Sequence, residues 1–468
     1  MRGRAFKNLV ILDSFEGAAS RRSYLLFLLE AAMDIKGYRH IPRSLFEAIT
    51  FLCQALPKRA VPTFLELLFG AMLTQNGFVT EAWLAIAAKR HWSSYYKWLQ
   101  TGRWSWVAVG LQTARLALRQ VPADKRCFLA IDDTVIFRCS SKAPESRIHH
   151  QHGQKANRPR FVLGQGWVSI ALCVSTCKRC VAIPVLSRLS RSTGNSGKLV
   201  AAKTLLRVIR PVFAHRLTTL LLDSWYMRKT LILPALEMGY QVIGQVRKDT
   251  ALYLPPEPHN GKRGRPRKYG VKWDDEQVSQ LPVIRQEMFL YGRRQKVHYR
   301  SARVLAYFLG GLPVIAVWSQ FEQRDGTMGR PRLILSTDLS LSAPRILLAY
   351  AKRWSIEDMF NQLKNRWGWK EAWQQSRQVL HRWTQILSTS YALPSLLSLN
   401  NGDQEKQLAN LCPWRVNQPI TAGRIRKGLA HILRHVDIRS MWNPKTGKFS
   451  PLNGNLNNKR PPDKRKRA

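Results

Sequence analysis

Acidic residues are scarce in this chain of 468 residues. It has 29 Asp and Glu against 75 Lys and Arg, which leaves a formal net charge of +46 at pH 7. Such an excess repels itself strongly unless a polyanion is bound. Nucleic acid is the polyanion we expect, because each phosphate that a protein neutralises releases a counterion. A ribosome or a membrane surface is the alternative, but the basic residues run through the whole chain rather than in one juxtamembrane cluster.

Cysteine and long apolar runs are also scarce. Seven cysteines, an odd number spread thinly over the chain, favour a reducing compartment over a disulfide framework. No stretch reaches the roughly 18 uninterrupted apolar residues that a membrane helix needs. The basic start is followed by an apolar run that ends at Asp13, which is too short for a signal peptide. We therefore expect a cytoplasmic protein with no membrane partner.

The periodicity of apolar residues divides the chain into five parts. Apolar residues make up 45% of the sequence, which is enough for a sizeable core. Strands in series, followed by a helix and further strands, predict a mixed α/β fold. The five parts are an all-α domain (1–120), the first part of an α/β core (121–250), a basic loop with a β-rich insertion (251–342), the C-terminal helices of the core (343–400) and a C-terminal region with a basic tail (401–468).

The helices expected in residues 1–120 are short and joined by tight turns. The last of them is basic and aromatic, which suits a helix-turn-helix DNA reader with His91 to Arg103 as its recognition segment. The alternative is a helical bundle whose aromatic residues only fill its core.

Acids at the ends of two predicted strands can converge on one site. Asp132 and Asp133 end an apolar strand that starts at Cys127, and Asp223 ends another that starts at Leu217. Phosphoryl transfer with two magnesium ions needs such hard oxygen ligands. Adjacent strand residues face opposite ways, so only one of the paired acids points into a given site. The alternative for a lone Asp of this kind is a helix N-cap.

The third acid is Glu357. If residues 350–364 form one helix, then Tyr350, Arg353, Glu357 and Lys364 share a wedge of about 60°. An acid flanked by these groups is suited to holding a metal beside a phosphate. The alternative is a solvated face with ordinary ion pairs. Ser355 and Asp358 resemble a capping box, at which the helix would restart and break the wedge.

The spacing Tyr-x2-Arg-x3-Glu-x6-Lys resembles the YREK group of bacterial insertion-sequence transposases, within the DDE, RNase H-like superfamily. The pair Asp133-Thr134 resembles the first metal-binding aspartate of that family, and Leu-Leu-Asp223-Ser-Trp-Tyr resembles the second. The family also carries a β-rich insertion between the second Asp and the Glu. The similarity covers roughly residues 120–395. Asn361 departs from it, because some relatives have a basic residue one turn after the Glu.

The resemblance implies an RNase H-like mixed sheet interrupted by the β-rich insertion. It also implies two Mg²⁺ ions, with Mn²⁺ as a substitute, bound by Asp133, Asp223 and Glu357. The reaction would be cleavage at transposon ends followed by strand transfer into target DNA, with a hairpin intermediate in relatives. Bringing two ends together implies a homodimer in the synaptic complex, on terminal inverted repeats and target DNA. Such a protein would be nucleoid-associated in a bacterial cytoplasm.

The resemblance also implies DNA contacts. Arg353 and Lys364 would hold phosphates, and Tyr350 would bond to the backbone near the cut. Trp318, in the β-rich insertion, would stack on an extruded base as an aromatic residue does in relatives. A tryptophan in the core of a strand is the alternative for Trp318.

Four further motifs have weaker patterns. Gly264 to Lys268 resembles an AT-hook, whose Arg265 and Arg267 would enter an A·T-rich minor groove, although a solvated basic loop has the same composition. Cysteines 173, 177 and 180 have metal-like spacing, but no second pair follows, which favours reduced thiols around a hairpin over zinc. Residues 149–152 contain three histidines and are a further candidate for metal binding. Residues 192–198 lack the spacing of a phosphate-binding loop, so ATP use is not indicated.

Two other functions are compatible with the sequence. The first is a non-catalytic DNA-binding repressor derived from a transposase. The second is a metal nuclease that hydrolyses DNA but never joins strands. Three intact carboxylates argue against the repressor, because without metal chemistry nothing would hold them together.

Overall fold

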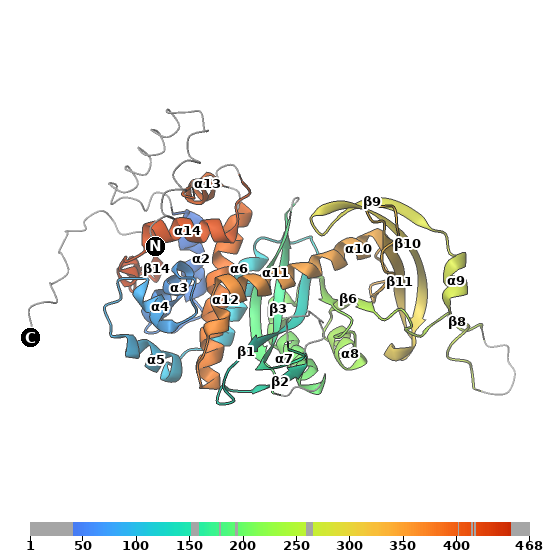
Figure 1. Cartoon of the computed structure of the whole chain (residues 1–468), viewed down its shortest axis with the longest axis horizontal. Coiled ribbons are helices and arrows are strands. Elements are labelled where there is room, and N and C mark those ends of the chain that lie inside the picture. The colour runs from blue at the N-terminus through green and yellow to red at the C-terminus, as the bar shows by residue number, and fades with distance from the viewer. Residues whose placement is uncertain are drawn as a thin grey trace, which may run out of the picture.

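A mixed β-sheet forms the middle of the structure, with α-helices at one end of its long axis and β-hairpins at the other (Figure 1). The computed structural model describes residues 41–150, 159–176, 179–191, 195–258, 265–400, 402–412, 415 and 418–450.

Strand β1 (Cys127–Phe137) lies in the interior of a 12-stranded sheet. It pairs antiparallel with β3 (Phe161–Ser175) and parallel with β5 (Thr218–Leu222), which in turn pairs parallel with β6 (Gln241–Val246). Every residue of β5 is buried, as expected for a parallel strand that is covered on both faces. The crossovers are helices α7 (Asn195–Phe213) and α8 (Lys229–Glu237). The mixed α/β sheet predicted from the sequence is therefore confirmed.

The β-rich insertion extends this same sheet. Strand β12 (Arg332–Ser336) pairs antiparallel with β6, and β11 (Leu312–Phe321) and β10 (Arg293–Ala306) follow beyond it. The insertion is thereby held to the core by backbone hydrogen bonds rather than by a flexible linker. The other strands are β2 (Ser146–His150), β4 (Cys180–Leu189), β7 (Leu252–Tyr253), β8 (Lys272–Trp273) and β9 (Ile284–Leu290), with a small separate pair, β13 (Trp442–Asn443) and β14 (Lys448–Phe449).

Helices from both ends of the described chain pack together (Figure 1). The guanidinium of Arg382, on α12 (Arg377–Asn400), donates to the backbone carbonyls of Leu99, Gly102 and Trp104. The two segments therefore share one core. The remaining helices are α2 (Arg43–Cys53), α3 (Val61–Leu73), α4 (Val79–Leu84), α5 (Trp92–Thr101), α6 (Trp106–Leu118), α9 (Asp275–Gln280), α10 (Ala343–Ala351), α11 (Ser355–Arg366), α13 (Asp403–Asn410) and α14 (Ala422–Leu433). None of the helices within the described ranges is long and apolar enough to cross a membrane.

Two local predictions from the sequence are wrong. Strand β1 does not end at its acids, because Asp132 and Asp133 pair with Ser169 and Val168 of β3 and the strand runs on to Phe137. An apolar run shows where a strand is buried but not where its hydrogen bonding stops. The acids therefore stand in mid-strand, where their backbone pairs with β3, whereas the pairing of β1 with β5 stops at Ile131.

The segment that starts at Tyr350 is not one helix. Helix α10 passes into a 3₁₀ turn at Lys352–Trp354 before α11 starts at Ser355. The expected restart of the helix at Ser355 is confirmed, but the expected capping box is wrong, because the N-cap residue is Trp354 and no side chain caps the helix. The buried face of α11 consists of Ile356, Met359, Phe360 and Leu363.

Candidate active site

The acids of β1 line a cavity of about 660 Å³ between the sheet and α11. The side chains of Asp132 and Asp133 are 16% and 17% exposed, so both are largely shielded from water but reachable. Glu357 and Lys364 of α11 line the same cavity. The structure thus brings together acids that are more than 220 positions apart in the sequence.

Arg353 connects the first strand to Glu357. Its Nη1 lies 3.1 Å from Oδ2 of Asp132, and its Nη2 lies 2.6 Å from Oε1 of Glu357. The guanidinium is 12% exposed. Buried ion pairs of this kind hold both partners in place, because removing one leaves an uncompensated charge.

Asp133 has different partners from Asp132, although the two are neighbours. Its Oδ2 lies 2.7 Å from Nζ of Lys198 on α7, and its Oδ1 accepts a hydrogen bond of 3.1 Å from the hydroxyl of Tyr226. The ammonium of Lys198 also lies 5.0 Å from the ring centre of Trp225. The alternation of side chains along β1 explains the difference, since adjacent residues face opposite ways.

Asp223 follows β5 directly. Its Oδ1 accepts hydrogen bonds from the backbone N–H groups of Trp225 and Tyr226, at 3.1 and 3.0 Å. The carboxylate therefore stabilises the turn after the strand, and the N-cap of α8 is Arg228 instead. Burial raises the pKa of Asp223, and the neighbouring charge of Asp133 adds to this effect.

The carboxylates repel one another. The pKa of Asp132 is raised to about 7, first by burial and then by the charge of Asp223, against the opposing effect of Arg353. Burial contributes most to this high pKa, and Arg353 offsets only part of it. Clusters of this kind are typical of sites that bind a cation or exchange protons.

The outer residues of the Tyr-Arg-Glu-Lys pattern also face the sheet. The ammonium of Lys364 lies 2.8 Å from Oγ1 of Thr134, which is on the same face of β1 as Asp132. Tyr350 is buried, and its hydroxyl donates to Oε1 of Gln245 at 3.5 Å. Burial raises the pKa of Tyr350 to about 12. The break between α10 and α11 does not separate these residues from the site.

Other candidates from the sequence lie away from the carboxylates. Trp318 packs against Trp273 with ring centres 5.8 Å apart, and it does not line the cavity at β1. Arg265 and Arg267 are exposed, and Gly264 of the same motif lies outside the described residues. Trp354, three residues before Glu357 in the sequence, is 55% exposed. Its ring centre lies 6.4 Å from that of Tyr291.

The metal-like patterns in the hairpins are not supported. His149 is buried with Nε2 at 3.1 Å from the carbonyl oxygen of Gly164, and His152 lies outside the described residues, as does Cys177. Among the residues that the structure describes, no three His, Cys, Asp or Glu side chains are arranged so that they could hold a metal ion.

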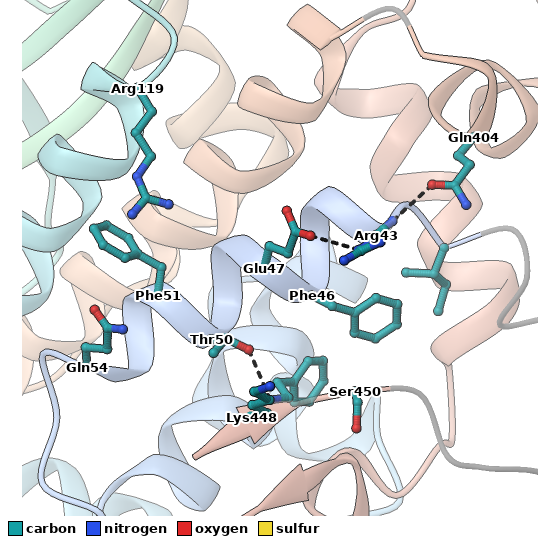
Figure 2. A pocket seen from close by; sticks show the side chains of 12 residues that line it. Arg43, Phe46, Glu47, Thr50, Phe51, Gln54, Arg119, Gln404, Lys448 and Ser450 are labelled. Carbon is teal, nitrogen blue, oxygen red and sulfur yellow. Dashed lines mark hydrogen bonds and ion pairs between the residues drawn. The ribbon is translucent and has the colours of Figure 1, made fainter. Parts of the chain in front are cut away.

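A second cavity, of about 740 Å³, lies against α2 and far from β1 in the chain's arrangement (Figures 1 and 2). Arg119 stacks on Phe51 in its wall, with the guanidinium carbon 3.6 Å from the ring centre. Glu47, the one carboxylate among its described lining residues, is paired with Arg43 at 2.9 Å. With a single acid that is already neutralised, this cavity has no group for phosphoryl transfer.

Three residues of the site were not assigned a role from the sequence. Asp132 was set aside in favour of its neighbour. Tyr226 ends the Leu-Leu-Asp223-Ser-Trp-Tyr motif and Lys198 ends the segment rejected as a phosphate-binding loop, but neither was given a role of its own. Lys198 follows a Gly/Ser-rich loop, which is the one local signal that could have singled it out. Only the packing of α7 beside β1 turns that lysine into a partner for Asp133.

Comparison with known families agrees with this geometry. Residues 52–303 match the family described as DDE superfamily endonuclease, which is more than half of the chain. The chain belongs to this family. A search of curated proteins found no match.

Membership implies a nuclease that acts on DNA. The matched range of this endonuclease includes Asp132, Asp133 and Asp223, but it ends before Glu357. The third acid is therefore supported by its contacts with Arg353 and by the residue pattern around it rather than by the family match.

Proposed function

We propose that this endonuclease is a cut-and-paste DNA transposase of the YREK insertion-sequence group, with an RNase H-like core. One observation carries the proposal: Arg353, from the Tyr-Arg-Glu-Lys pattern, contacts both a carboxylate of β1 and Glu357. An arginine that only faced solvent would not contact both the carboxylate of β1 and Glu357. The proposal accounts for the charge of +46 as well, since transposon ends and target are both DNA.

The residues at β1 have the chemistry of a divalent-metal site, although no three carboxylates among the described residues are arranged to hold one ion together. Asp133, Asp223 and Glu357 are the proposed ligands, and Asp132 is the alternative to Asp133 because it neighbours Asp223 and Arg353. All donors are carboxylate oxygens, which Mg²⁺ prefers. The pKa values of Asp132 and Asp223 are raised mainly by burial, and the repulsion between the carboxylates adds to this effect, which a bound cation would relieve. When bound, two Mg²⁺ or Mn²⁺ ions supply an activated nucleophile and stabilisation of the leaving oxygen.

The chain's own cations prepare the site for DNA. Arg353 and Lys198 pair with carboxylates, and both could turn to a phosphate of bound DNA if the carboxylates bound metal. Lys364, anchored at Thr134, lies at the edge of the same cavity and binds a phosphate next to the cut. Tyr350 orients Arg353, whose guanidinium carbon lies 5.9 Å from the Tyr350 ring centre.

The remaining predicted DNA contacts belong to the same proposal. The N-terminal helices, with α5 as the recognition helix, bind the terminal inverted repeats. Arg265 and Arg267 are exposed and suited to a minor groove. Trp318 and Trp354 are two candidates for stacking on an extruded base, and Trp354 is the nearer to Glu357 in sequence. A homodimer holds the two ends together, as strand transfer requires.

The test is a cleavage and joining assay on DNA with the terminal repeats that flank the coding sequence, in Mg²⁺ and in Mn²⁺. We expect the wild type to release the ends and join them to a target. Asp133→Ala, Asp223→Ala and Glu357→Ala should bind the same DNA but neither cut nor join. Asp124→Ala is the matched control, because that side chain is 71% exposed and pairs only with Lys125 among the ion pairs of the described residues.

The other outcomes separate the alternatives. Cleavage without joining would make the protein a hydrolysis-only nuclease. Binding to the repeats without cleavage in either metal would make it a repressor derived from a transposase. Cleavage that survives all three alanine substitutions would overturn the three-carboxylate site itself.

A further inference from the structure

Two cysteines lie directly behind the start of the helix that carries Glu357. Cys173 of β3 pairs across the sheet with Ala182, and Cys180 of β4 pairs with Ser175, so the two cysteines are diagonal neighbours on one face of the hairpin. The Sγ atoms of Cys173 and Cys180 lie 3.6 and 3.8 Å from the hydroxyl oxygen of Ser355, the first residue of α11. One hydroxyl thus contacts both sulfur atoms.

The hairpin that bears the two cysteines is held on both sides. Lys352 donates to Oγ of Ser175 at 2.6 Å. Arg179 donates to the carbonyl oxygen of Ile420 at 2.5 Å and to Oγ of Ser398 at 3.1 Å. These contacts hold the two sulfur atoms in a fixed arrangement.

The two thiols differ in access and in acidity. Cys180 is half-buried and lines a cavity of about 720 Å³ between the hairpin and α10, whereas Cys173 is 4% exposed. The thiol of Cys173 hydrogen-bonds to Cys180 and lowers the pKa of Cys180 to about 6, and Lys352 adds to this effect. The same contact raises the pKa of Cys173. The charged residues that line this cavity with Cys180 are Arg126, Arg179, Arg345, Lys352 and Asp358.

We propose that Cys180 is a peroxide-reactive thiol and that Cys173 resolves it to a disulfide across β3 and β4. The pair combines an accessible thiolate with a protected thiol in contact with it, which is the arrangement that such chemistry requires. Their shared contact with Ser355 places this modification site against the first turn of α11, two residues before Glu357.

The chemistry consumes one hydrogen peroxide. The Cys180 thiolate attacks one peroxide oxygen, the O–O bond breaks, and the departing hydroxide takes up a proton to become water. The sulfur of Cys173 then attacks the Cys180 sulfenic acid. The S–S bond forms as the S–O bond breaks, and the hydroxyl leaves as water with the proton of Cys173. Two thiols lose two electrons in total, and the peroxide is reduced to two waters.

Disulfide formation changes the support of α11. A bond of about 2.05 Å draws the sulfur atoms together. Ser355 then loses its thiol partners and keeps its hydrogen bond to the carbonyl of Lys352. We expect amide exchange in the first turn of α11 to be roughly two- to fivefold faster in the oxidised protein. A loss of DNA cleavage on oxidation is expected as well, and this last step alone rests on the proposed function.

The first experiment uses the full chain treated with hydrogen peroxide and analysed by peptide mass spectrometry. The expected product is a peptide cross-linked through Cys173 and Cys180, which dithiothreitol reverses. In Cys173→Ser, Cys180 should be trapped as a sulfenic acid by dimedone. Cys139→Ser and Cys177→Ser should leave the cross-link unchanged. A cross-link to Cys177, or oxidation confined to the exposed Cys139, would overturn the proposal.

The second experiment follows the pH dependence of alkylation by iodoacetamide in the wild type. The thiolate population of a thiol with a pKa near 6 falls about twofold between pH 7 and pH 6, whereas that of an ordinary thiol falls about tenfold. We expect the roughly twofold change at Cys180, and a tenfold change there would contradict its role as the attacking thiol. Both experiments are independent of DNA cleavage, so failure of the proposed function would leave their outcome unaffected.

Discussion

The guanidinium of Arg353 lies 3.1 Å from the carboxylate of Asp132, although 221 positions separate the two residues. The same guanidinium contacts Glu357 at 2.6 Å. The buried guanidinium of Arg353 therefore links β1 to α11. The arrangement also means that Asp132 is neutralised by the protein itself, whereas Asp133 is paired with Lys198 on the other face of the strand.

Substitution of the neighbouring acids should separate a metal ligand from a positioning residue. We expect Asp133→Asn to lower the rate of DNA cleavage about a thousandfold or more, because a ligand that stabilises the reacting charges is lost. Asp132→Asn should lower it by about 10- to 100-fold, as loss of a group that orients a ligand does. Single-turnover cleavage at saturating DNA measures both. The reverse order of effects would make Asp132 the ligand.

In the proposed metal site, Lys198 competes with metal for Asp133. Lys198→Met keeps the length of the side chain and removes the charge that now lies 2.7 Å from Oδ2 of Asp133. We expect Mg²⁺ to bind roughly five- to tenfold more tightly, since a charged hydrogen bond no longer has to be broken. Calorimetric titration with Mg²⁺ is the measurement. Lys229→Met, on the exposed start of α8, is the control, and weaker binding in Lys198→Met would show that the lysine supports the metal site instead.

His381 should make the stability of the fold depend on pH. The imidazole is 6% exposed, and its Nε2 accepts a hydrogen bond of 3.2 Å from the backbone of Leu189. Burial lowers its pKa to about 4, from an ordinary value of 6.5. Protons therefore bind to the unfolded state first as the pH falls. Stability from this group is fully present above pH 6.5 and is lost progressively between pH 6.5 and pH 4.

Urea denaturation at pH 7.5 and pH 5 measures this effect. His381 should account for a loss of about 2 kcal/mol in the free energy of unfolding between the two values. His381→Gln keeps an acceptor for Leu189 but does not titrate, so its loss over the same interval should be smaller by about that amount. Equal losses in the two proteins would mean that the imidazole is protonated in the folded state.

Gly77 and Gly368 should tolerate no side chain where their backbones meet. A Cβ on Gly77 would lie 1.7 Å from the carbonyl oxygen of Gly368, which itself has φ of +70°. We expect Gly77→Ala to reduce the free energy of unfolding by about 3 kcal/mol, because backbone on both sides must shift. Gly423→Ala is the control, since its nearest neighbour would be 4.0 Å away. Thermal denaturation compares them, and similar melting temperatures would contradict the close approach.

The regular elements of the core could be predicted from local pattern. The strands expected to start at Cys127 and at Leu217 are β1, which starts at Cys127, and β5, which starts one residue later at Thr218. The Tyr-Arg-Glu-Lys spacing singled out residues that face the sheet even though the helix is interrupted at Lys352–Trp354. The spacing was informative because the contacts of these residues with the sheet do not require an unbroken helix. The roles of the N-terminal helices and of Arg265, Arg267 and Trp318 in DNA binding stay predictions.

The sequence by itself determined the charge, the succession of strands and helices, and the set of acids available for a site. These follow from composition and from the alternation of apolar residues, both of which are local. Only the tertiary structure decided that β1 continues past its acids, that the insertion joins the core sheet through β12 and β6, and that Lys198 and Tyr226 contact Asp133. The physical reason is that strand pairing and ion pairs join residues far apart in the chain, and no local pattern records which partners will meet.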